Sequence, residues 1–347
     1  MPQQIRFPWP APERSRQRIW PVFLPFWGCR QRCIYCAQDL QTGSTRQSLQ
    51  AHLESLRQEL TQAWQTGKSP LQLGFFGGTF TALPWSWQLR FLDLAREFKQ
   101  KGLITKIRCS TRPDRVCPEL LHGLRKQGLD ILELGIQSFY TPVLELSGRG
   151  YTEHQARQAC AWVRASGLEL GIQLMPGLPG HSPDLWLRDA AIACSQEPVQ
   201  VRIYPCLVLQ GTGLEELWKL GWYLPWCLDS SIAPLARALL RFWRKDITVI
   251  RIGLPQEPGL LPHIMAGPWH PALGDLVQSR ALLYILLTRA FQLGPGPKQL
   301  LCPQMLQGQI WGPGKANLSR LAQAGITQSR TSFHPGRDFV LQRLAAD

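Results

Sequence analysis

The chain alternates short apolar segments with longer segments in which apolar residues recur every three or four positions. Short runs of this kind are typical of buried strands, and the longer spacing is typical of helices that cover them. The predicted strands are residues 20–26, 71–76, 106–110, 131–136, 168–175 and 199–205, and the predicted helices are residues 46–65, 85–100, 118–127, 152–166 and 183–195. This alternation predicts right-handed crossovers and a parallel α/β sheet. The periodicity fits an open sheet and a barrel equally well.

The pattern changes after residue 209. Further predicted elements are helices at 213–220, 231–244 and 273–292 and a strand at 247–253, and Gly294-Pro295-Gly296-Pro297 is typical of a linker. We therefore expect four consecutive parts. They are a basic N-terminal arm (1–18), a strand–helix core (19–210), a helical and strand extension (211–293) and a small basic C-terminal unit (294–347).

Composition and charge narrow the class of protein. The longest wholly apolar run is residues 281–287, far short of the roughly 20 residues of a membrane span. Arg and Pro stand where a signal peptide would carry its apolar stretch, so we expect a cytoplasmic protein. The net charge of +14 favours a polyanionic partner, RNA first, although an Arg-rich host composition would give the same balance.

The chain has ten cysteines, and three of them form a local cluster after the first predicted strand. Cys29, Cys33 and Cys36 are spaced C-x-x-x-C-x-x-C. Three thiolates on a 4Fe–4S cluster leave one iron open to a small molecule. A structural zinc site needs a fourth Cys or His nearby, and the next His is His52 on a predicted helix. We favour iron–sulfur over zinc and over a chance grouping of buried cysteines.

The cysteine triplet, with Tyr35 before its last member, resembles the signature of the radical S-adenosylmethionine (SAM) superfamily. Gly77-Gly78 after the second strand resembles the glycine pair that holds the methionine end of SAM. Further matching motifs follow in the expected order at residues 110–114, 132–138, 147–150 and 173–180. Over residues 19–210 the chain is similar to the radical core of the catalytic subunit of Elongator and its bacterial relatives. It is also similar to oxygen-independent coproporphyrinogen III oxidase.

The resemblance implies a partial (β/α)6 radical SAM barrel. It implies a 4Fe–4S cluster held by Cys29, Cys33 and Cys36, with SAM on the open iron. One electron, from an external reductant of the flavodoxin or ferredoxin type, would cleave SAM to methionine and a 5′-deoxyadenosyl radical that abstracts hydrogen from substrate. The substrate is not identified by the resemblance, and RNA is the expected class.

The resemblance also assigns SAM contacts residue by residue. Tyr35 would pack on the adenine, and Gly77 and Gly78 would meet the methionine end. The polar residues assigned to the ribose or carboxylate are Gln137, Arg149 and Gln173. Alternatively, the two glutamines satisfy backbone groups at strand ends and Arg149 binds a loop carboxylate.

Two carboxylates lie inside predicted strands. Glu133 and Glu169 would have to be paired or functional if they face the barrel interior, because an unpaired buried charge is costly. Either could instead face a helix or solvent.

Three departures from the related families bear on the reaction. The Elongator subunit has a longer first gap between its cysteines, an acetyltransferase domain that we do not expect here, and a Glu where this chain has Ser110. The coproporphyrinogen oxidase has an additional Cys where this chain has Gln38. Neither reaction is carried over, and the nearest match is a stand-alone Elongator-like radical SAM protein. A tetrapyrrole-type small-molecule enzyme and a non-catalytic iron–sulfur protein are the alternatives.

The C-terminal segment 309–321 resembles the central part of a KH domain. A helix, a glycine turn and a second helix starting at Lys315 or Ala316 would place Lys315 at a nucleic-acid phosphate. The alternative is a helix-turn-helix cap packed on the rim of the barrel.

Overall fold

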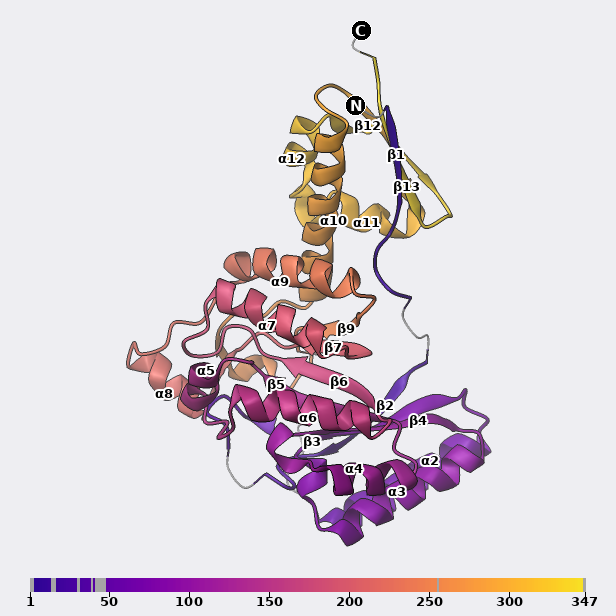
Figure 1. Cartoon of the computed structure of the whole chain (residues 1–347), viewed down its shortest axis with the longest axis vertical. Helices are drawn as coiled ribbons and strands as arrows, with labels where there is room; N and C mark the ends of the chain where they lie inside the picture. The colour runs from indigo at the N-terminus through magenta and orange to yellow at the C-terminus, as the bar shows by residue number, and fades with distance from the viewer. Residues whose placement is uncertain are drawn as a thin grey trace. The chain divides into compact units, whose positions relative to one another are not determined.

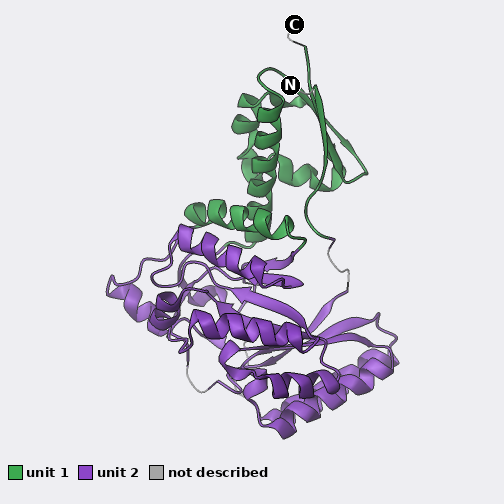
Figure 2. Cartoon of the chain, in the orientation of Figure 1, with its two compact units in different colours: residues 1–12, 228–246, 270–347 green, residues 13–227, 247–269 purple. Residues whose placement is uncertain are grey.

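The structure, a computed structural model, describes residues 3–13, 17–29, 32–38, 40, 48–254 and 256–345. In this part of the chain two compact units are present (Figure 2). The larger unit comprises Glu13–Cys227 and Ile247–Trp269, and the smaller comprises Met1–Pro12, Leu228–Asp246 and His270–Asp347. The units are interleaved along the sequence, whereas the four expected parts follow one another.

A parallel sheet forms the centre of the larger unit, with seven strands among the described residues. Their order in the sheet is their order in the chain: β2 (Ile19–Leu24), β3 (Leu71–Gly77), β4 (Ile104–Thr111), β5 (Ile131–Gln137), β6 (Glu169–Leu174), β7 (Gln200–Ile203) and β9 (Thr248–Ile252). Consecutive right-handed crossovers place every connecting helix on the same face, so the other face curls inward as a half-barrel. The six predicted strands are confirmed, and β9, which the sequence pattern left in the extension, joins them.

Helices cover the outer face of this sheet (Figure 1). They are α2 (Leu49–Gln65), α3 (Trp85–Gln100), α4 (Pro118–Lys126), α6 (Glu153–Ala165) and α7 (Pro183–Ser195). Two shorter helices, α5 (Thr141–Leu146) and α8 (Gly213–Lys219), also belong to this unit. In α2 the buried positions are Leu49, Leu53, Leu56, Leu60 and Ala63, the stripe that the helical spacing predicted. The expected start of α2 at residue 46 lies outside the described residues. The larger unit also has a small antiparallel pair, β8 (Val208–Leu209) and β10 (Ile264–Ala266).

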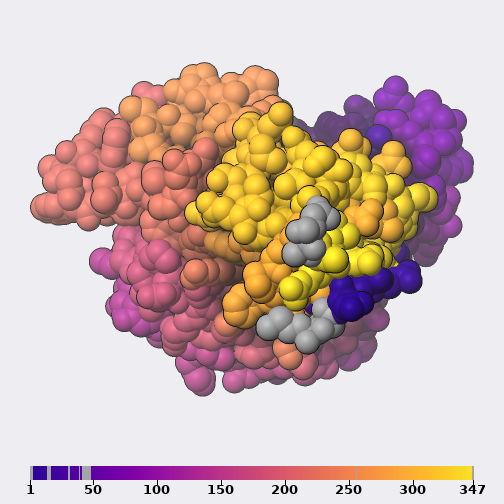
Figure 3. Space-filling view, turned by 90° about the horizontal axis from the view of Figure 1, so that it is seen from above, coloured from indigo at the N-terminus to yellow at the C-terminus, as the bar shows by residue number. Residues whose placement is uncertain are grey.

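The sheet of the smaller unit joins the two ends of the chain. Four strands in the described part have the order β1 (Gln4–Pro8), β13 (Asp338–Arg343), β11 (Lys298–Pro303) and β12 (Ile326–His334). β1 pairs with β13, and the rings of Phe7 and Phe339 stack with centroids 4.9 Å apart. Figure 3 shows the indigo N-terminal residues beside yellow C-terminal ones. The helices of this unit are α9 (Leu228–Trp243), α10 (Leu273–Gln292), α11 (Gln307–Ile310) and α12 (Leu318–Gln323).

Lys315 does not begin a helix, and this expectation is corrected by the structure. Gly314 and Lys315 have φ angles of 59° and 63°, which a right-handed helix cannot include. The second helix, α12, therefore starts at Leu318. Asn317 holds the turn to α10 by donating a hydrogen bond of 2.9 Å to Ser279 Oγ. Lys315 thus lies exposed on a turn.

No helix in the described residues has the length and apolar character needed to cross a membrane.

The loop after β2 is fastened to the turn after β3. Gly78 N donates to Leu24 O at 2.9 Å, and Thr79 N donates to Trp27 O at 2.7 Å. The Gln38 side chain adds a bridge, because its Oε1 accepts from Phe26 N at 2.6 Å while its Nε2 donates to the carbonyl of Gly77 at 2.5 Å. These hydrogen bonds therefore hold the cysteine loop and the Gly77-Gly78 pair together.

Gly78 is required by this contact between two backbones. A Cβ at Gly78 would lie 2.0 Å from Trp27 O, so Gly78→Ala must push the two loops apart. We expect the free energy of unfolding to fall by about 1–3 kcal/mol, the usual cost of overpacking, measured by thermal or denaturant unfolding. Gly308→Ala is the matched control, because a Cβ there meets nothing within 4 Å. Equal free energies of unfolding for Gly78→Ala and Gly308→Ala would contradict the close backbone contact at Gly78.

Candidate active site

A cavity of about 790 Å³ lies on the inner face of the half-barrel. It reaches from the carboxyl ends of the strands to their amino ends. All the predicted site residues of the larger unit line it: Cys29, Cys33, Tyr35, Cys36, Gly77, Gly78, Gln137, Arg149 and Gln173. Lys315 belongs to the smaller unit. The fold therefore brings together residues up to 144 positions apart, and their individual contacts with SAM stay predictions.

The cysteine loop brings three thiol groups to one end of this cavity. Cys29 Sγ lies 3.3 Å from Thr79 Oγ1, and Cys36 N donates to Cys33 O at 3.0 Å. Burial raises the pKa of the Cys36 thiol to about 12, and the neighbouring Cys33 and Cys29 add to the increase. Within the described residues no three Cys, His, Asp or Glu side chains are arranged as metal ligands. The loop thus supplies the donors without gathering them at one point.

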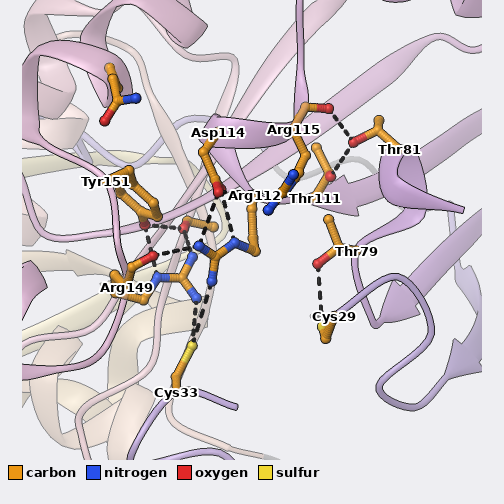
Figure 4. A network of polar contacts seen from close by, with 12 residues as sticks. Cys29, Cys33, Thr79, Thr81, Thr111, Arg112, Asp114, Arg115, Arg149 and Tyr151 are labelled. Carbon is orange, nitrogen blue, oxygen red and sulfur yellow. Dashed lines mark hydrogen bonds and ion pairs between the residues drawn. The ribbon is translucent and has the colours of Figure 1, made fainter. Parts of the chain in front are cut away.

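Two guanidinium groups point at Cys33 (Figure 4). Arg149, which is buried, donates to Cys33 Sγ at 3.1 Å and to the carbonyl of Gly135 at 2.5 Å, and its Nε donates to Tyr151 OH at 2.9 Å. Arg112 Nη1 lies 3.9 Å from the same sulfur. Because buried positive charge needs a negative partner, the two guanidinium groups make this end of the cavity suited to an anionic group.

The partners of the two arginines differ. Arg112 forms a bidentate pair with Asp114 at 2.9 and 3.1 Å. Arg149 has no carboxylate partner in the described part of the chain, so the alternative of a loop carboxylate is not found. Three cysteines beside excess positive charge are a donor set that fits a 4Fe–4S cluster, whose thiolate ligands make it anionic.

Gln137 presents an unsatisfied acceptor at the end of β5. It has a φ of 66°, and its Oε1 is buried without a hydrogen-bond partner among the described residues. A buried carbonyl left unpaired costs about 1–3 kcal/mol, so a donor from a ligand is expected there. Gln173 lies opposite Gly135 on the neighbouring strand and also lines the cavity. Both glutamines thus line the cavity, and their contacts with SAM stay predictions.

Part of the cavity is lined by a network of charged side chains that includes Lys106, Arg108, Glu169 and Arg202. Glu133, 1% exposed, accepts from Arg108 Nε at 2.7 Å and from Arg202 Nε at 2.8 Å. Glu169 pairs with Lys106 at 2.5 Å. Both carboxylates are therefore paired, one of the two outcomes expected for inward-facing groups. Sequence reasoning missed the arginines because an Arg in a strand is ordinarily taken as an exposed position.

Cationic side chains outnumber carboxylates in the lining of the cavity. The cations are Arg32, Lys106, Arg108, Arg112, Arg149, Arg202 and Arg251, and the carboxylates are Glu13, Glu169 and Glu257. The cavity is accordingly suited to anionic ligands.

Curated relatives match between about half and two thirds of the chain. The tRNA uridine(34) acetyltransferase of Methanocaldococcus infernus is 32% identical over 203 residues, which cover 52% of this chain and 38% of that protein. Elongator complex protein 3 of Homo sapiens is 29% identical over 253 residues, which cover 65% of this chain and 44% of that protein. The chain thus spans less than half the length of these relatives.

Solved structures share the fold. The archaeal Methanocaldococcus infernus Elp3 with an N-terminal deletion superposes with a TM-score of 0.58 at 25% identity, covering 76% of this chain and 62% of that one. Coproporphyrinogen III oxidase from Escherichia coli superposes with a TM-score of 0.50 at 19% identity, covering 68% and 54%.

Two family models account for most of the chain. The one described as Radical SAM superfamily matches residues 24–190, and the one described as Radical_SAM C-terminal domain matches residues 198–282. The first match runs from the end of β2 into α7, and the second begins just before β7 and ends within α10 of the smaller unit. The chain therefore belongs to the radical SAM superfamily of enzymes.

Proposed function

We propose that this chain holds a 4Fe–4S cluster on Cys29, Cys33 and Cys36, binds SAM next to it, and begins hydrogen abstraction from an RNA substrate. The observation that carries the proposal is a single cavity lined by the three cysteines, by Arg149 beside Cys33, and by Gln137 with its unpaired carbonyl. Reduced by a flavodoxin- or ferredoxin-type protein, the cluster supplies one electron for SAM cleavage.

The residues of this chain bind and orient. Arg149 and Arg112 balance the negative charge at Cys33. Gln137 Oε1 accepts a hydrogen bond from SAM, and Gln173 binds a polar group of the same molecule. Tyr35, which is buried and lies 3.3 Å from Arg149 through its hydroxyl, presents its ring to the adenine. Fixed donors and acceptors of this kind position a reactant at little entropic cost during the reaction.

RNA as the substrate class has two supports. The curated relatives that match the core include enzymes named for a tRNA uridine. The net charge of +14 and the cationic cavity lining suit a polyanion.

The cluster assignment is tested by substitution of the cysteines. After anaerobic reconstitution the protein should contain about four irons and four sulfides per chain. Cys29→Ala, Cys33→Ala and Cys36→Ala should each lose them, because each removes a thiolate ligand. Cys160→Ala is the control: that thiol is buried in α6, where burial raises its pKa to about 12. A cluster retained in the triple variant would refute the proposal.

The SAM site is tested at Gln137. Reduced holoenzyme with SAM should form 5′-deoxyadenosine. Gln137→Met keeps the side-chain volume and removes the amide, so the Kd for SAM should rise about tenfold while the iron content is unchanged. Gln88→Met is the matched control, because Gln88 Oε1 is also buried and unpaired but lies outside the cavity lining. The same rise in Kd in both variants would show that Gln137 has no direct role.

RNA binding is tested by titration of bulk transfer RNA at several salt concentrations. Affinity should fall steeply with salt because phosphate contacts release counterions. Lys315→Glu, at an exposed turn, should weaken binding and reduce the salt slope by about one. Lys126→Glu on α4 is the control, because it makes the same charge change on the larger unit. A chain truncated at Gly294 is unsuitable, since it removes β11, β12 and β13 from the sheet that β1 completes. Salt-independent or undetectable binding would rule out RNA.

A further inference from the structure

We propose that Arg202 and Arg251 form a binding site for an oxyanion of the substrate, a phosphate or a carboxylate, in the part of the cavity beyond the SAM residues. The inference rests on the proposed function, because it places the substrate beside SAM. It goes further by naming the group that is recognised and the residues that recognise it.

The two arginines are opposite one another on neighbouring strands. Arg202 on β7 pairs in register with Arg251 on β9, and both side chains line the cavity. The register of this pair of strands shifts after Val201, which lies opposite Val249. Without the shift, Ile250 would lie opposite Arg202 and Arg251 would point to the outer face, since successive side chains alternate. The irregularity therefore turns Arg251 inward, the kind of re-aiming that bulges produce beside active sites.

Two like charges in this arrangement are unfavourable unless something lies between them. Strands are about 4.8 Å apart, and like charges directly opposite each other destabilise a sheet. The nearby carboxylate, Glu133, is already shared between Arg202 and Arg108. Arg251 has no ion pair among the contacts of the described residues, although Glu257 on the following loop also lines the cavity. An anion bound between the two guanidinium groups removes this imbalance.

The guanidinium group of Arg202 is fixed in an orientation that suits such a ligand. Its Nε donates to Glu133, its Nη1 donates to Tyr204 OH at 3.2 Å, and the guanidinium lies over the ring of Phe76 with 4.9 Å to the centroid. A guanidinium fixed in this way presents its remaining donors in a planar fork that matches phosphate and carboxylate oxygens. Arg251, on the edge strand and exposed, supplies the second set of donors.

The site is in line with the SAM residues. In register across the sheet, Gly135 lies opposite Gln173, Gln173 opposite Arg202, and Arg202 opposite Arg251. At about 4.8 Å per strand the arginine pair begins one strand from Gln173. An oxyanion held there anchors a substrate whose reacting carbon extends back toward SAM.

The test measures anion binding to the reconstituted holoenzyme by calorimetry at constant ionic strength. The probes are inorganic pyrophosphate for the phosphate class and succinate for the carboxylate class. Arg251→Gln removes one half of the site, and Arg125→Gln removes the same charge from the exposed surface of α4. We expect at least one probe to bind the wild type, with Kd raised about tenfold or more in Arg251→Gln and unchanged in Arg125→Gln. The probe that binds more tightly identifies the class.

A second measurement distinguishes a ligand site from a structural role. Without added anion, Arg251→Gln should unfold at a higher temperature than the wild type, because the repulsion between Arg202 and Arg251 is relieved. If Arg251 instead had a structural role, the variant would unfold at a lower temperature than the wild type. No binding of either probe, or equal weakening in both variants, would overturn the site. Formation of 5′-deoxyadenosine by wild type and Arg125→Gln reports on the proposed function separately. If no 5′-deoxyadenosine forms but anion binding still depends on Arg251, the proposed function is wrong and the oxyanion site is retained.

Discussion

The burial of one guanidinium group, that of Arg149, links the cysteine loop to the half-barrel. Its donors reach Cys33 on the loop, the carbonyl of Gly135 on β5, and Tyr151. Burying such a charge is costly unless it is hydrogen-bonded and balanced. The described residues offer it no carboxylate, so its stability rests on its hydrogen bonds to Cys33 Sγ, the Gly135 carbonyl and Tyr151 OH. The loop and the end of β5 consequently depend on each other.

The half-barrel could be predicted from the sequence because its rules are local. Each strand and the helix after it occupy a few dozen residues, and the crossover rule then fixes the handedness. Pairings between distant segments have no local signature. Arg6 on β1 contacts Asp338 on β13 across 332 positions, and nothing near either residue predicts the pairing. The strand β9 was recognisable from its apolar residues, but its place beside β7 was not.

The candidate site, like the fold, was only partly predictable from the sequence. The cysteines and the two glutamines were predictable because the family resemblance concerns short motifs, and the fold places them around one cavity. The positions of Gly78 and Lys315 were understood less well. Gly78 also permits two protein backbones to touch, which the resemblance did not indicate, and Lys315 has a left-handed φ, so the second helix does not start there. Packing distances and backbone angles of this kind are set by tertiary neighbours.

The pairing of β1 with β13 has a consequence for synthesis on the ribosome. Translation releases β1 first and β13 last, and at about 5–20 residues per second the interval is tens of seconds. During this time the apolar face of β1, including Phe7, has no partner strand. The larger unit has all its residues once Trp269 has emerged. The half-barrel can therefore enclose its cysteine loop before β13 has emerged, and the sheet that pairs β1 with β13 can close only later.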